Sequence, residues 1–198
     1  MSVVIVDNEK MGSFLGEVLR RAVHTSFAWI PLGYFSLMAV SSDDFKLCIH
    51  LSLLFLFVSC LILDCLRIKH QWIIFGARHY ESQRLSSMTF MLFGVLVVLF
   101  LSPNHCIATA IIVSASIVDP IMGVMRRCSL SPVMVFISGV SLVFATWMVL
   151  GSHAYFSLSW VFVISVITVW VEYYQWRLID DNLLLQIVPL SLVLYLAH

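Results

Sequence analysis

The sequence has few charged side chains. Of its 198 residues, 11% are Asp, Glu, Lys or Arg, whereas 61% are hydrophobic. A soluble globular domain carries about 25% charged residues, so this composition excludes an ordinary soluble protein. At about 20 residues for each membrane-spanning helix, the chain has room for about seven spans and no separate soluble catalytic domain. We therefore expect a single transmembrane domain over residues 1–198.

Cysteine motifs and a secretory signal are also missing. The five cysteines show no CxxC spacing, so we expect small core residues rather than disulfides or zinc ligands. Residues 1–22 contain acidic side chains and lack a basic region ahead of an apolar run, unlike a signal peptide. We expect them to form a cytoplasmic N-terminal segment, and we expect no nucleic-acid partner.

Seven apolar segments account for most of the sequence. They predict an all-α polytopic membrane protein with about seven transmembrane helices. The third and seventh segments are short, and the first is interrupted by Pro31 and Gly33. The expected spans lie near residues 23–42, 45–66, 87–102, 105–125, 131–151, 154–176 and 183–197.

Basic residues are sorted between alternate connections. The connections after the first, third and fifth spans hold one basic residue, Lys46. The other ten lie in the N-terminal segment, residues 67–86, the Arg126-Arg127 pair and Arg177. By the positive-inside rule, the N-terminus is cytoplasmic and residues 67–86 form a cytoplasmic interfacial loop. We expect a multi-pass protein of the cell inner (plasma) membrane.

Asp119 is the most unusual residue of the apolar segments. It lies within span 105–125 and directly precedes Pro120, which removes the helical partner of the Ser116 carbonyl. A carboxylate inside a membrane is costly and marks a candidate functional site. Asp119 lies about 10 Å along the helix from the Arg126-Arg127 pair. The alternative is a buried acid paired with a neighbouring helix.

Residues 67–86 carry a second candidate pattern. Arg78, Glu81 and Arg84 fall close to one helical face and predict a helix lying in the membrane interface. Such a row is either a surface ion-pair ladder of little energetic value or a clamp for phosphate. Both interpretations remain open at this stage.

The third candidate is the acidic stretch near the C-terminus. Asp180-Asp181-Asn182 precedes the last span, and one of these residues suffices to cap a helix. The others leave carboxylate oxygens free for a cation. Glu172 lies about 8 Å deeper in the membrane than Arg177 and is a second intramembrane acid. Carboxylates and arginines together suit a polyanion held through Mg²⁺ and bidentate contacts, with interfacial ion pairs as the alternative.

Several short motifs follow one another along the chain. They are Glu17 to His24 with Arg20 and Arg21, Asp64 with Arg67, Ala77 to Glu81, Ser86 to Phe90, Asp119 to Gly123, Glu172, and Asp180 to Asn182. In their order and spacing they resemble the family of dolichol kinases, phytol kinases and CTP-dependent diacylglycerol kinases, often grouped with phosphatidate cytidylyltransferases. The sequence departs from this family in one motif, because the Lys-Ser and Glu-Gly motif of the family has no counterpart after Arg126-Arg127.

The resemblance implies a CTP-dependent kinase that phosphorylates a polyprenol, phytol or diacylglycerol at the cytoplasmic face, with Mg²⁺ as cofactor. Its partners would be CTP, a lipid alcohol or lipid phosphate, and the bilayer. The alternatives are a phosphatidate cytidylyltransferase that makes a CDP-lipid, or a small transporter or membrane scaffold without enzymatic activity. The implied site comprises catalytic Glu81, Asp119 and Glu172, phosphate-binding Arg78, Arg84, Arg126 and Arg127, metal-binding Asp119, Asp180 and Asp181, and supporting Arg21, His24, Asp64, Arg67 and Asn182.

Overall fold

The computed structural model describes residues 14–72, 83–150, 152–173 and 180–197, and every regular element in these ranges is helical. All seven apolar segments expected from the sequence form helices. The elements are α1 (Phe14–Ser26), α2 (Trp29–Val40), α3 (Asp43–His70), α4 (Ser87–Leu101), α5 (His105–Arg127), α6 (Pro132–Val149), η2 (Ser152–Ala154), α7 (Leu158–Tyr173) and α8 (Asp181–Leu196).

Four stretches of the described chain are long and apolar enough to cross a membrane. The first combines α1 and α2, and the others are α3, α5 and α6. Helices α4, α7 and α8 are apolar but have only 15, 16 and 16 residues. For the described residues, the structure therefore confirms an all-helical protein with candidate membrane spans.

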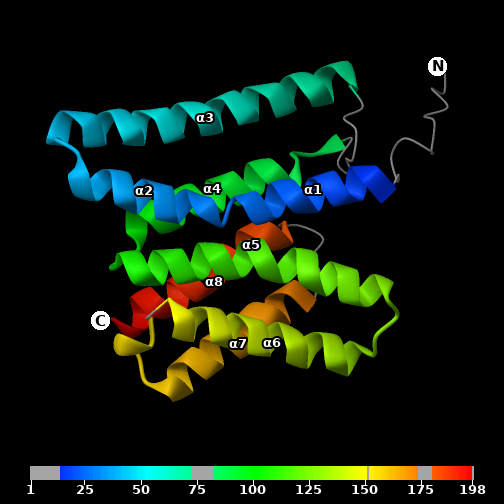
Figure 1. The fold of residues 1–198 in the computed structure, drawn as a ribbon. Helices are drawn as coiled ribbons and strands as arrows, with labels where there is room; N and C mark the ends of the chain where they lie inside the picture. Colours follow the sequence, from blue (N-terminus) through cyan, green and yellow to red (C-terminus); the bar gives the residue numbers. More distant parts are fainter. Residues whose placement is uncertain (1–13, 73–82, 151, 174–179, 198) are drawn as a thin grey trace, which may run out of the picture.

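Helix α5 forms the centre of the bundle. It packs against α1, α2, α4, α6 and α8, and two thirds of its most apolar stretch is buried (Figure 1). Ile111, Ile112, Ala115 and Val118 are completely buried in the core. Because Asp119 directly follows this row, the fold brings a carboxylate to the edge of the apolar core.

Two expected boundaries differ from the structure. The first span is not interrupted at Pro31 but at Phe27–Ala28, between α1 and α2. Pro31 lies in the first turn of α2, where a missing N–H leaves no hydrogen bond unmade. Helix α1 begins at Phe14, so the second half of the expected cytoplasmic segment 1–22 is helical and joins the first candidate span.

The expected interfacial loop 67–86 also begins later than predicted. Helix α3 continues to His70, and Arg67 is part of it. Residues 73–82, which contain Arg78 and Glu81, lie outside the described residues. At the far side of the loop, Ser86 caps α4 by accepting a hydrogen bond from the Thr89 N–H.

Close helix contacts depend on two glycines. A methyl group at Gly94 would lie 2.6 Å from Gln186 Nε2 of α8, and one at Gly139 would lie 2.7 Å from Met122 Sδ of α5. These approaches bring α4 against α8 and α6 against α5. They pack the short helices α4 and α8 into the core rather than at its edge.

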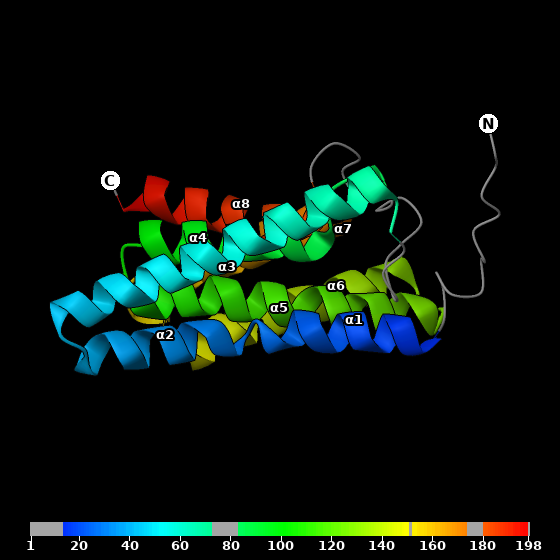
Figure 2. The same ribbon diagram turned by 90° about the horizontal axis from the view of Figure 1, so that it is seen from above.

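Helix α3 lies apart from the other helices (Figure 2). It begins beside α2 and runs diagonally away from α1, and it packs mainly on α4. Along α3, which is described over its whole length, Asp64 and Arg67 are the only buried residues. Most of its apolar side chains are therefore exposed, as expected for a helix surrounded by lipid.

Candidate functional site

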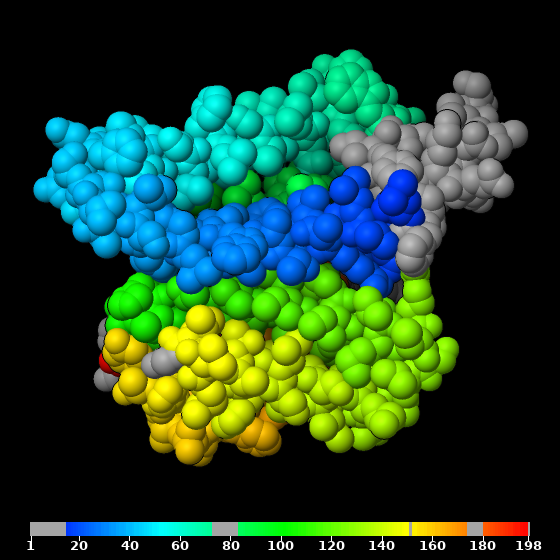
Figure 3. Space-filling view, in the orientation of Figure 1, coloured from blue at the N-terminus to red at the C-terminus, as the bar shows by residue number. Residues whose placement is uncertain are grey.

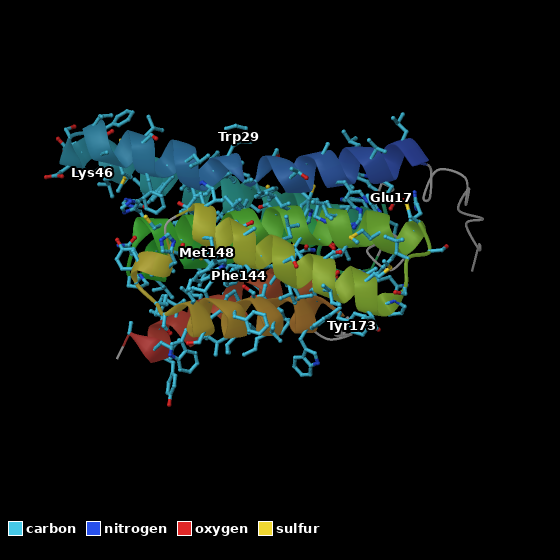
Figure 4. The ribbon with its side chains drawn as sticks, turned by 60° about the horizontal axis from the view of Figure 1, so that its bottom comes forward. Glu17, Trp29, Lys46, Phe144, Met148 and Tyr173 are labelled. Atoms are coloured by element: carbon cyan, nitrogen blue, oxygen red, sulfur yellow. The ribbon has the colours of Figure 1, made fainter. Side chains whose placement is uncertain are left out.

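Charged side chains from several helices meet at one end of the bundle. The beginning of α1, the ends of α3, α5 and α7, and the start of α8 lie at this end (Figure 1). In Figure 4, Glu17 and Tyr173 mark it, while Lys46 marks the opposite end. The alternation of the helices thus gathers the basic connections predicted from the sequence at the same end.

His24 is the buried link between α1, α5 and α8. The residue is 1% exposed, and its Nε2 lies 2.6 Å from Asn182 Oδ1 and 3.9 Å from Asp119 Oδ2. The Asn182 amide nitrogen donates to Asp180 Oδ1 at 2.7 Å, so the amide oxygen must be the acceptor toward His24. In this arrangement His24 donates from Nε2 to Asn182 Oδ1.

Glu172 is completely buried at the end of α7. The Arg126 guanidinium of α5 donates to both of its carboxylate oxygens. The negative charges of Asp119 and Asp181 are near enough to act electrostatically on Glu172. Three carboxylates from α5, α7 and α8 thus share one environment, and Arg126 compensates part of their repulsion.

A second set of ion pairs joins α1 to α5. Glu17 pairs with Arg127 through one oxygen and with Arg21 through the other. The Arg21 guanidinium lies against Gly123, where a methyl group would come within 3.3 Å of Nη2. The arginines predicted to bind phosphate, Arg126 and Arg127, are thus held by Glu172 and Glu17.

Asp180 acts as the N-cap of α8. Its Oδ1 accepts from the Asn182 backbone N–H and side-chain amide, and its Oδ2 accepts from Arg84 and Ser87, each at 3.4 Å. Because both oxygens already accept hydrogen bonds, Asp180 fits the role of a structural cap better than the predicted role of metal ligand.

Asp64 and Arg67 form a separate structural anchor for α3. Asp64 accepts hydrogen bonds from the Ser86 N–H at 2.8 Å, the Ser86 hydroxyl at 2.7 Å, the Thr89 hydroxyl at 2.6 Å and Arg67 Nε at 3.0 Å. Arg67 also donates to the Arg84 carbonyl at 2.6 Å. This set, called the α3 anchor below, fixes the end of α3 to the start of α4.

The structure brings most of the predicted residues into one assembly, called the inner polar cluster below. Its members are Glu17, Arg21, His24, Asp119, Arg126, Arg127, Glu172, Asp181 and Asn182. Asp180 and Arg84 lie at the edge of the inner polar cluster. Arg84 pairs with Asp180 and its carbonyl accepts from Arg67, so Arg84 connects the cluster with the α3 anchor. Arg78 and Glu81 lie outside the described residues.

Two contributors were not among the predicted site residues. Glu17 pairs with two predicted arginines, and its i, i+4 spacing to Arg21 was a usable signal. Gln186 is completely buried and donates to the carbonyls of Met91 and Asn182. Its i, i+4 spacing to Asn182 places both on one face of α8, but only the packed fold shows that this face is internal.

The cluster does not contain a complete metal site made of protein side chains. Within the described residues, no group of three or more His, Cys, Asp or Glu side chains is arranged to hold a metal ion. Such a complete protein site is not needed for Mg²⁺, which commonly takes one or two carboxylates together with substrate phosphates. Asp181, half-buried and electrostatically coupled to Glu172, fits such a partial site.

The opposite end of the bundle has a different character. A pocket there is lined by the α4–α5 and α6–α7 connections, the starts of α5 and α7 and the C-terminal end of α8, and its residues include Pro103, Tyr155 and Trp160. Tyrosine and tryptophan are typical of the boundary between membrane and water. Charged groups of the inner polar cluster do not line it.

Comparison of the chain with protein families, with characterised proteins and with solved structures finds no match in any of the three. The site geometry and the sequence motifs therefore carry the functional argument.

Proposed function

We propose that the protein is a membrane phosphotransferase that uses CTP to phosphorylate a lipid alcohol at the inner polar cluster. The observation that carries this proposal is the convergence of Asp119, Glu172 and Asp181 with arginines at one end of an apolar bundle. A membrane helix needs basic anchors at its end, but placing the charges of Asp119 and Asp181 near the buried Glu172 is unfavourable for stability, and a functional role would explain this arrangement. The resemblance to lipid kinases and cytidylyltransferases supports the same conclusion.

The proposed reaction places the lipid hydroxyl beside Asp119. The hydroxyl oxygen forms a bond to the γ-phosphorus of CTP, and the bond from that phosphorus to the bridging oxygen breaks, releasing CDP. Asp119 accepts the hydroxyl proton, because Glu172 is occupied on both oxygens by Arg126. The sequence analysis assigned Asp119 to both catalysis and metal binding, and the proposed reaction keeps only the catalytic role.

Two sets of residues would bind the nucleotide. Asp181 and the phosphates would hold Mg²⁺, which neutralises charge that develops on the transferred group. Arg127 would contact the phosphates by exchanging its bond to Glu17 for bonds to the nucleotide, and Arg126 would contact them through the guanidinium N–H groups that it does not donate to Glu172. His24 positions the site by donating to Asn182 within the cluster.

We further propose that all seven apolar segments cross the membrane, with the N-terminus in the cytoplasm. The sorting of basic residues supports this orientation. Helices of 15 or 16 residues extend only about 24 Å, less than the hydrocarbon core of about 30 Å, so α4, α7 and α8 require local thinning of the bilayer or cover from other helices. Reporter fusions in residues 43–46 and 128–130 should report opposite sides, and a shared side would refute the arrangement.

The activity is tested with purified protein, Mg²⁺, and CTP labelled either on the γ-phosphate or on the base. Lipid alcohols and phosphatidate serve as acceptors. Transfer of the γ-label to a lipid alcohol is expected, together with its loss in Asp119→Asn and its retention in Asp43→Asn at the opposite end. Transfer of the base label to phosphatidate would show that the protein is a cytidylyltransferase and not a kinase. Absence of both, with folded protein, would favour the transporter or scaffold.

A further inference from the structure

Helix α1 turns charged side chains toward the bundle and apolar side chains outward. Glu17 and Arg21 both face α5. Leu15, Val18 and Leu19 are instead 66%, 45% and 52% exposed. In the space-filling view, α1 (blue) forms part of the molecular surface beside α5 (green) (Figure 3). A soluble amphipathic helix has the reverse arrangement, so the inward charges of α1 need partners of their own.

The inward face of α1 forms a polar seam with α5. The two helices pack side by side and run in opposite directions, so successive turns of one meet successive turns of the other (Figure 1). The contacts of the seam are Glu17 with Arg127, Arg21 with Gly123, and His24 with Asp119. Because Gly123 has no side chain, the Arg21 guanidinium fits against α5 one helical turn from Asp119. The seam therefore leads from the end of α5 to the proposed catalytic base.

The Glu17 carboxylate is held by two guanidinium groups from different helices. One oxygen accepts from Arg21 of α1, and the other pairs with Arg127 of α5. Guanidinium groups that converge on one oxyanion are the arrangement by which proteins hold carboxylate or phosphate. Two positive charges face one negative charge here, so these three side chains keep one positive charge in excess. A more highly charged anion than a carboxylate would balance it.

The two arginines can be reached from the end of the bundle that Glu17 marks in Figure 4. The Arg127 side chain is 53% exposed, and those of Arg21 and Glu17 are each 18% exposed. The pair of Glu17 with Arg21 has i, i+4 spacing, and such pairs contribute little to stability, so a change of partner costs little. A terminal phosphate offers about two negative charges and three acceptor oxygens, more than the carboxylate does.

We propose that Arg21 and Arg127 form a binding site for a terminal phosphate group, which the Glu17 carboxylate fills until a phosphate displaces it. Glu17 therefore acts as a built-in competitor that lowers the affinity for phosphate. This inference deepens the proposed function and rests on it only for the identity of the ligand, because Arg127 is assigned there to the nucleotide. It makes Arg21 a direct phosphate ligand. Binding of phosphate itself does not depend on transfer.

The experiment measures the rise of the thermal midpoint of full-length protein in detergent with increasing inorganic tripolyphosphate, which gives an apparent Kd. Glu17→Gln should bind about tenfold more tightly than the wild type, and Arg21→Gln about tenfold more weakly. Arg21→Lys keeps the positive charge but loses the guanidinium fork, and it should also bind more weakly. Asp43→Asn at the opposite end is the control and should leave the Kd unchanged. Midpoints without ligand verify that each variant is folded.

The variants separate this site from a purely structural ion pair. Loss of a structural contact cannot strengthen phosphate binding, so an unchanged or weaker Kd in Glu17→Gln would overturn the proposal. Wild-type binding by Arg21→Lys would also overturn it, because it would leave only a general effect of charge. A parallel series with phosphatidate in mixed micelles identifies the source of the phosphate. The expected shifts with phosphatidate and not with tripolyphosphate would assign the site to a lipid phosphate.

The same data separate this inference from the proposed function. Failed transfer of the γ-phosphate, together with the expected shifts in Kd, would reject the kinase and leave the phosphate site standing. Transfer without these shifts would reject the phosphate site alone. Absence of binding by both the wild type and Glu17→Gln, with either probe, would overturn the site as well.

Discussion

The pairing of Arg126 with Glu172 allows a quantitative test of the buried charges. Glu172 is fully buried beside the charges of Asp119 and Asp181, while Arg126 is one-third exposed. Removing one partner of a buried pair costs about 3–5 kcal/mol when the other charge stays uncompensated. Because water reaches Arg126, we expect a value near the lower limit, about 3 kcal/mol, for Arg126→Met.

Glu172→Gln should be much milder. The substitution removes one of three neighbouring negative charges, and the Arg126 side chain can turn to water. We therefore expect the free energy of unfolding to fall by about 1 kcal/mol. The double variant should resemble Glu172→Gln, because a neutral amide at this position leaves no buried charge for Arg126 to compensate. The three variants therefore form a cycle with a coupling energy of about 2–3 kcal/mol.

The assay is thermal unfolding in detergent, measured as the fraction of monodisperse protein after heating at a fixed scan rate. For a chain of this length, 1 kcal/mol corresponds to about 2–4 °C. Arg126→Met should lower the midpoint by about 6–12 °C, and both other variants by about 2–4 °C. Lys46→Met, which breaks an exposed pair with Asp43, is the control and should change little. Equal losses in the two single variants, or additive losses in the double variant, would refute the buried-charge reasoning.

Two further predictions concern packing. Gly94→Ala should destabilise the protein by about 1–3 kcal/mol because its methyl group would meet Gln186, whereas Gly33→Ala, with open space around it, should be neutral or slightly stabilising; the same thermal assay separates them. Asp64→Asn should loosen the α3 anchor and increase maleimide labelling of Cys60, measured with the other four cysteines replaced by serine. Unchanged labelling of Cys60 would show that the anchor does not hold α3.

The sequence determined the local features of this protein. Hydropathy predicted seven apolar helices, and their ends mostly agree with the structure to within a few residues. Capping by the acidic stretch at residues 180–182 was also predictable, because a cap bonds to backbone groups of its own first turn. The break between α1 and α2 was misplaced at Pro31, since proline is well tolerated in the first turn of a helix.

The sequence also predicted that most of the acids and the arginines lie toward one side of the helices, but it did not assign their partners. His24 meets Asn182 at a separation of 158 residues, and Arg126 meets Glu172 at a separation of 46. Such pairs depend on which helices become neighbours in the bundle, and the i, i+4 rule applies only within one helix.

Asp119 and Asp64 illustrate the difference most clearly. Both are acids within apolar helices, and the sequence grouped both with the site. The packed structure separates them. The charge of Asp64 is compensated by Arg67, and its oxygens accept hydrogen bonds within the α3 anchor. Asp119 instead shares the environment of Glu172 in the inner polar cluster. A helix sequence fixes where a carboxylate lies along its axis, but only the packing of several helices decides which groups compensate its charge.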